Sequence, residues 1–190
     1  MHFAIFSGKA TNVSRSSAKQ SPMWPWGHAA FGYLAYRLLP TKRKAHESVL
    51  VLLVLLVGTQ LPDLVDKPLA WWATILPTGR SFAHSLLTLS VFIVLAYAVA
   101  RRYDRTDLAF AASFGYASHL VGDSLNSLLK LQFADLTFLL WPVLPSPDYP
   151  TDKSFTAHFQ NLSFSGFTIV GFVLSVLALA VFVRTELNRR

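Results

Sequence analysis

The sequence contains no cysteine, so disulfides and thiolate metal ligands are excluded. Any metal ion would have to be held by His, Asp or Glu, a donor set that favours zinc, manganese or other first-row metals over iron–sulfur clusters. Charged residues are also scarce, at 14% of 190 residues, whereas 53% are hydrophobic. This balance is more apolar than that of ordinary soluble proteins and indicates a membrane protein of one domain.

Acidic residues are missing from the first 22 positions, which are rich in Ser, Lys and Arg. This stretch also lacks the apolar core of a secretory signal peptide. We therefore predict a disordered basic tail over residues 1–22 and a membrane-embedded domain over residues 23–190. Met23 is a candidate start of the functional chain.

Basic residues outnumber acidic residues by 17 to 10, for a formal net charge of +7. Such a charge can indicate a nucleic-acid partner. Here the basic residues form short clusters between apolar runs, which is the pattern that orients helices in a membrane. The sequence thus predicts membrane lipids as partners and no nucleic acid.

Five apolar segments predict an all-α, integral membrane helical bundle of about five transmembrane helices. They cover approximately residues 25–39, 47–64, 82–100, 107–129 and 164–183. A bilayer core of about 30 Å requires about 20 helical residues. The first and fourth segments can span only if their polar residues face protein or a cavity. A sixth apolar stretch, residues 133–145, is short and broken by proline, which predicts an interfacial or re-entrant segment.

Three basic clusters determine the expected orientation. They are PTKRK at 40–44, RRYDR at 101–105 and RTELNRR at 184–190. Five spans place all three on one side, which the positive-inside rule makes cytoplasmic. The predicted topology is N-out and C-in in the plasma or inner membrane, and the basic tail on the outer side is a modest contradiction to it.

This topology, which rests only on apolar runs and Lys/Arg, gathers most other ionisable residues on the outer side. They are His28, Asp63, Asp66, Arg80, His84, His119, Asp123 and His158. All except Arg80 are potential metal ligands. His119 and Asp123 are the most specific pair, because an i, i+4 spacing places them on one helix face and burying both in a membrane helix is costly without a partner.

Each position also has a simpler explanation. His28 fits an aromatic belt at the membrane interface, and His84 and Arg80 fit interfacial positions as well. Asp63 and Asp66 could merely end a helix. The coincidence of these residues on one predicted side favours a metal site over the separate explanations.

The residue types suit hydrolytic chemistry. Imidazoles and carboxylates form zinc sites that can leave a position for water, and the metal makes that water a better nucleophile. Asp66 or Asp123 could act as a base or a bridging ligand. Arg80 could bind a phosphate or carboxylate and stabilise developing negative charge. A serine nucleophile is disfavoured, because no nucleophile-elbow pattern surrounds Ser81 or Ser85.

The ordered motifs WGHAAFGY, LPDLVDK, GRSFAHSLL, YASHLVGDSL and LLWPVLP resemble the YdjM-like family of inner-membrane, metal-dependent hydrolases. The resemblance covers about residues 23–145, with a compatible last span. It implies one set of metal ligands, with Asp66 as a possible addition. The candidate catalytic residues, Asp66 and Arg80, come from the residue chemistry above. The implied ligands are His28, Asp63, His84, His119 and Asp123.

The order of these motifs is also distantly similar to the zinc-dependent phospholipase C and single-strand nuclease superfamily. The further His and His-x-x-x-Glu/Asp ligands of that superfamily are missing after Asp123, where His158 is the one later histidine. We therefore expect one or two divalent ions, with zinc favoured, rather than three.

The leading hypothesis is a membrane-bound hydrolase that acts on a phosphoester or other lipid-derived bond at the outer membrane face. One alternative is a metal or proton transporter, since ionisable residues within a membrane also mark ion paths. Another is a non-catalytic membrane protein that binds a partner through its outer loop. The transporter is disfavoured because the inner halves of the second, third and fifth segments are almost purely apolar.

Overall fold

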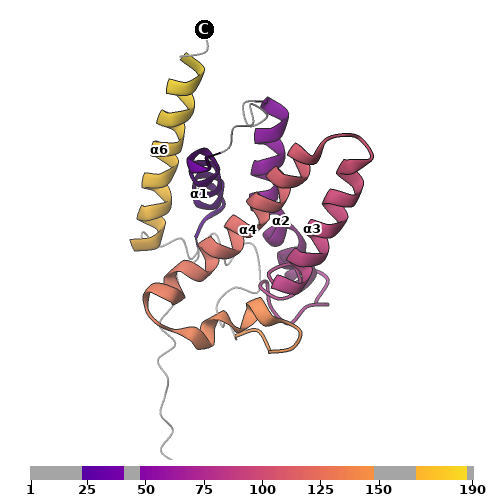
Figure 1. The fold of residues 1–190 in the computed structure, drawn as a ribbon. Helices are drawn as coiled ribbons and strands as arrows, with labels where there is room; N and C mark the ends of the chain where they lie inside the picture. Colours follow the sequence, from indigo (N-terminus) through magenta and orange to yellow (C-terminus); the bar gives the residue numbers. More distant parts are fainter. Residues whose placement is uncertain (1–22, 41–47, 148–165, 188–190) are drawn as a thin grey trace, which may run out of the picture.

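The fold was taken from a computed structural model, which describes residues 23–40, 48–147 and 166–187. These residues form helices and contain no strand, so the predicted all-α class is confirmed for the described chain (Figure 1). The elements are α1 (Pro25–Leu38), α2 (Val49–Trp71), α3 (Leu86–Arg101), α4 (Thr106–Leu129), the 3₁₀ helix η2 (Phe133–Leu140) and α6 (Gly166–Leu187). The predicted tail at residues 1–22 and His158 lie outside the described residues.

Helix α4 is the centre of the bundle. It packs against α1, α2 and α3, whereas α6 packs against α1 (Figure 1). Near the start of α4, an apolar cluster consists of Tyr36, Val51, Leu55 and Ala111. Its residues come from α1, α2 and α4, so the three helices that carry most of the polar site residues are joined by this cluster.

Helices α2 and α4 approach closely because two glycines face the contact. A Cβ added at Gly58 would lie 2.5 Å from the carbonyl oxygen of Ala112, and one added at Gly115 would lie 2.9 Å from the backbone nitrogen of Thr59. Neighbouring backbone cannot move away as the end of a flexible side chain can. The absence of both side chains therefore sets the separation of these helices.

Helix α2 is longer than the sequence predicts. The expected apolar segment ended near residue 64, and Asp63 and Asp66 could have marked the end of the helix. Instead the helix continues through Pro62 and Pro68 to Trp71. A proline removes one backbone hydrogen bond, and for Pro62 this loss is offset by burial in the bundle. Asp63 and Asp66 consequently project from a continuous helix.

Two helices are long and apolar enough to cross a membrane, judged by length and composition. They are Val49–Trp71 and Gly166–Thr185. The apolar helix α3 is shorter, because its first turn begins at Leu86 rather than at the expected residue 82. The described helices thus support two spans rather than the predicted five, since α1 is short and α4 contains many buried polar residues.

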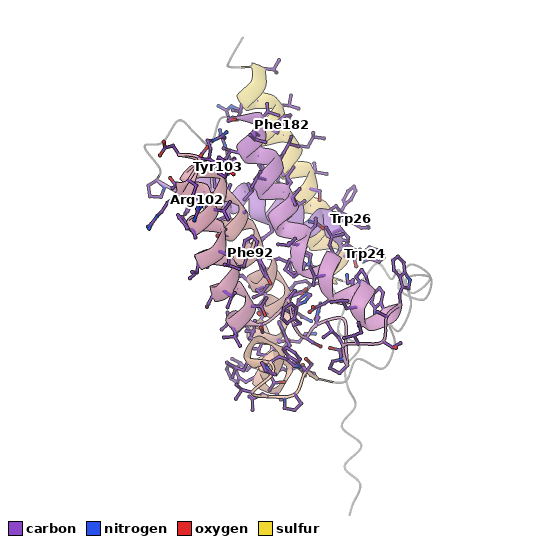
Figure 2. All side chains as sticks on the ribbon, turned by 90° about the vertical axis from the view of Figure 1, so that its right-hand side faces the viewer. Trp24, Trp26, Phe92, Arg102, Tyr103 and Phe182 are labelled. Atoms are coloured by element: carbon purple, nitrogen blue, oxygen red, sulfur yellow. The ribbon has the colours of Figure 1, made fainter. Side chains whose placement is uncertain are left out.

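Basic residues mark one end of the bundle. Figure 2 places Arg102 and Tyr103, in the turn between α3 and α4, at the same end as Phe182 of α6. Arg37, at the end of α1, donates a hydrogen bond to Thr185 of α6. The segment between α2 and α3 lies at the opposite end together with η2 (Figure 1). The bundle is therefore polarised along its long axis.

Candidate metal centre

Seven of the eight residues that the sequence singled out converge in one buried cluster. Helix α1 contributes His28, α2 contributes Asp63 and Asp66, the segment before α3 contributes Arg80 and His84, and α4 contributes His119 and Asp123. The three histidine side chains are almost completely buried. Buried imidazoles and carboxylates must be paired or must bind a metal, because each loses its hydration.

Four atoms surround a common point. His84 Nε2 lies 3.3 Å from His119 Nε2, 3.5 Å from Asp63 Oδ1 and 3.4 Å from Asp123 Oδ2. His119 Nε2 lies 3.8 Å from Asp63 Oδ1 and 3.6 Å from Asp123 Oδ2. Ligands bound tetrahedrally at about 2.1 Å from zinc are separated by about 3.4 Å. These five separations are thus close to those within a tetrahedral site. The sets of His and Asp atoms that lie within 4.8 Å of one another are Asp63, His84 and His119, and His28, His119 and Asp123.

The opposite ring nitrogens of the two central histidines are held by other groups. His84 Nδ1 lies 2.8 Å from Asp66 Oδ2, and His119 Nδ1 lies 2.6 Å from the carbonyl oxygen of Thr59. When Nδ1 donates in each contact, the lone pair of Nε2 points at the common point. Metal-binding histidines are usually oriented in this way, by a carboxylate or a backbone carbonyl behind the ring.

Asp66 therefore lies behind His84 and not at the common point. Its carboxylate also accepts hydrogen bonds from the backbone N–H groups of Ser81, Ala83 and His84. These four contacts hold the turn that precedes α3. The sequence analysis named Asp66 as a base or a bridging ligand, whereas the structure places its carboxylate against His84 Nδ1 and the backbone N–H groups of this turn.

Each central carboxylate uses one oxygen for the common point and the other for a cation. Asp63 Oδ2 lies 2.6 Å from Lys67 Nζ, and Asp123 Oδ1 lies 2.8 Å from Arg80 Nη2. These ion pairs fix the orientation of both carboxylates. Lys67 was not singled out from the sequence, although its i, i+4 spacing from Asp63 on a helix was a usable signal.

His28 lies at the edge of the cluster. Its ring stacks on that of His119, with centroids 3.9 Å apart, and its Nε2 is 3.4 Å from Asp123 Oδ1. Its buried Nδ1 has no hydrogen-bond partner among the described residues. A Cβ added at Gly122 would lie 3.0 Å from this nitrogen. The bare backbone at Gly122 is thus what allows the ring to reach its place.

The protein environment favours positive charge at this point. Burial lowers the pKa of His84, but hydrogen bonds to Asp123, Asp63 and Asp66 outweigh that effect and raise its pKa to about 10. The carboxylates that stabilise a proton on His84 Nε2 would also stabilise a metal ion bound to that nitrogen. The donor set and its charge therefore fit a divalent cation.

The described helices thus form an apolar bundle with a buried His/Asp cluster that could hold a metal ion, and two of these helices are long and apolar enough to cross a membrane. The model of the family described as YdjM inner membrane protein matches residues 23–188, so the chain belongs to that family. Searches of curated proteins and of solved structures give no significant match.

Proposed function

We propose that the protein is a membrane-bound, metal-dependent hydrolase that acts on a phosphoester or other lipid-derived bond. The observation that carries the proposal is the convergence of two imidazole nitrogens and two carboxylate oxygens, from Asp63, His84, His119 and Asp123, with five separations of 3.3 to 3.8 Å. A divalent ion bound there, with zinc favoured, would act as a Lewis acid and would activate for hydrolysis a water molecule that it takes up as an additional ligand.

A single ion suits this cluster best. His119 has one nitrogen available, because Nδ1 is engaged with Thr59, and one nitrogen binds one ion. The position beside Asp123 Oδ1, where a second ion could be shared with His28, has the Arg80 guanidinium 2.8 Å away. Two cations at that carboxylate oxygen would repel each other. In this proposal His28 supports Asp123 and His119 from the edge of the site.

The depth of the cluster supports a lipid-derived substrate. Asp63 is 14 residues from the start of α2 and His119 is 13 residues from the start of α4. At 1.5 Å per residue, both lie about 20 Å from the basic end of the bundle. In a hydrocarbon core of about 30 Å, a cytoplasmic basic end would place the cluster in the outer half. This placement takes the basic end as cytoplasmic, as in the proposed N-out, C-in topology in the inner membrane.

Transport of a metal or proton is a weaker proposal. Between the cluster and the basic end, the described helices are joined by the apolar cluster of Tyr36, Val51, Leu55 and Ala111. An ion path would have to cross this cluster, and buried polar residues near it on α2 and α4, such as Thr59 and Ser113, offer hydroxyl groups rather than carboxylates or imidazoles. A purely partner-binding role would not explain why two histidines and two carboxylates share one point.

Elemental analysis and a hydrolysis assay test the proposed function together. Detergent-purified protein is expected to contain about one zinc ion per chain, and to hydrolyse at least one member of a panel of phosphate-ester lipids. Chelation should remove both the ion and the activity, and added zinc should restore them. Zinc-free protein contradicts the metal site. Zinc-loaded protein that is inactive on the whole panel but carries zinc into proteoliposomes contradicts the hydrolase and supports transport.

Replacing Asp66 by asparagine is expected to weaken zinc binding about 10–100-fold, the range found when a metal-binding histidine loses its carboxylate partner. The amide would present a donor to the N–H groups that now converge on the carboxylate, so the His84 ring would lose its fixed orientation. Competition with a zinc chelator measures this change. Ser90→Ala, on the exposed side of α3, is the control, and equal zinc affinity in both variants would contradict the orienting role.

A further inference from the structure

We infer that Lys67 and Arg80 together form a binding site for a phosphate-type anion at the edge of the candidate metal centre. The inference rests on the proposed metal-dependent function and specifies the chemical class of its substrate. It adds Lys67, which has no place in the metal site itself, as a residue that recognises the substrate.

The charges of the cluster are the first argument. The carboxylates of Asp63, Asp66 and Asp123 carry three negative charges, and Lys67 and Arg80 carry two positive charges. A divalent ion held by neutral histidines brings the total to one positive charge. Without the two cations the loaded cluster would remain negative and would repel an anion. The pair therefore makes the metal-loaded site attractive to anions.

The position of the two cations is the second argument. The Lys67 and Arg80 side chains have relative exposures of 16% and 13%, whereas those of His84 and His119 are 0%. The cations are thus nearer the exterior than the central histidines. The stem of Lys67 lies beside Gly79, where an added Cβ would be 3.4 Å from Lys67 Cγ. Lys67 consequently adjoins the segment that carries Arg80.

Both cations are pre-positioned. The Lys67 ammonium lies 5.8 Å from the centroid of the Trp71 ring, one turn further along α2. The Arg80 backbone is held on both sides, because its N–H donates to Thr78 Oγ1 and its carbonyl accepts from Ser146 Oγ. When a metal ion takes up negative charge from Asp63 and Asp123, each cation keeps its place and has donors to share with an anion.

Calorimetric titration of zinc-loaded protein in detergent with inorganic phosphate tests the inference. Wild type is expected to bind phosphate. Lys67→Met, which keeps an apolar stem but removes the charge, should bind it at least about tenfold more weakly, the loss typical of a charge-assisted hydrogen bond. Lys67→Arg should retain most of the affinity. Lys130→Met, at the exposed end of α4, is the matched control and should resemble wild type.

Zinc content, measured on every sample, separates this inference from the proposed function. Zinc-free wild type overturns both. Zinc-loaded wild type that does not bind phosphate, or Lys67→Met that binds it as tightly as wild type, overturns the anion site alone. Micelles containing phosphatidic acid, compared with diacylglycerol, provide the second arm. Binding of phosphatidic acid as well as phosphate identifies a lipid headgroup, and binding of phosphate alone identifies a soluble anion.

Discussion

Replacing Asp123 by asparagine is expected to reduce bound zinc from about one ion per chain to less than about a tenth of that amount. The substitution removes the negative charge and can turn an N–H₂ group toward His84 Nε2 and His119 Nε2, from which Oδ2 is now 3.4 and 3.6 Å away. A donor cannot bind a cation. The amide oxygen can still accept from Arg80, so the fold should be maintained.

The measurement is elemental analysis of detergent-purified protein, with helical content followed by circular dichroism. The matched control is Asp107→Asn, because Asp107 lies at the other end of the same helix and pairs with Arg105 away from the cluster. This control is expected to retain a full complement of zinc. A stoichiometric ion in Asp123→Asn, under conditions where wild type also holds one, would show that the cluster does not bind the metal through this carboxylate.

Replacing Gly115 by alanine is expected to lower the stability of the protein and weaken zinc binding at the same time. The new Cβ would overlap the carbonyl oxygen of Leu55 and lie 2.9 Å from the nitrogen of Thr59. Overpacking of this kind costs about 1–3 kcal/mol, and the greater helix propensity of alanine returns about 1 kcal/mol. The clash is between a side chain and backbone, so α2 and α4 must separate.

Separation of α2 and α4 affects the candidate metal centre directly, since Asp63 is on α2 and His119 is on α4. The Thr59 carbonyl that orients His119 is also on α2. Thermal unfolding in detergent and chelator competition measure the two effects. Gly166→Ala is the control, because an added Cβ there has no atom within 4 Å. If Gly115→Ala is as stable and as rich in zinc as Gly166→Ala, the close helix contact does not support the site.

The sequence predicted the helical class, four of the helix ranges to within a few residues and the set of residues that converge. Helices can be predicted from apolar runs because each helix that is buried or in contact with lipid needs apolar residues within its own segment. The convergence of His28, His84 and His119 followed from the topology, even though only two of the five expected spans have the length and composition of a membrane helix. Whether the bundle has five membrane spans or two, these three histidines lie toward the same end of it.

Helix α2 shows where sequence reasoning failed. The apolar run predicted a segment that ends near residue 64, where Asp63 and Asp66 could end a helix, yet the helix extends to Trp71. Local propensity cannot include the contribution of packing against α4. Lys67 was also missed, because a lysine after an apolar run can have many roles. Only the structure shows that its Nζ lies 2.6 Å from Asp63 Oδ2.

The sequence by itself determined which side chains this protein can use: no thiolates, few charges, and histidines and aspartates near one end of the apolar segments. Only the tertiary structure decided how they are used. It places Nε2 of two histidines and one oxygen each of Asp63 and Asp123 around a single point, and places Asp66 behind His84. The reason is physical, because ligand geometry depends on which atom of each side chain faces the centre, and helix packing and hydrogen bonds between distant segments determine that choice.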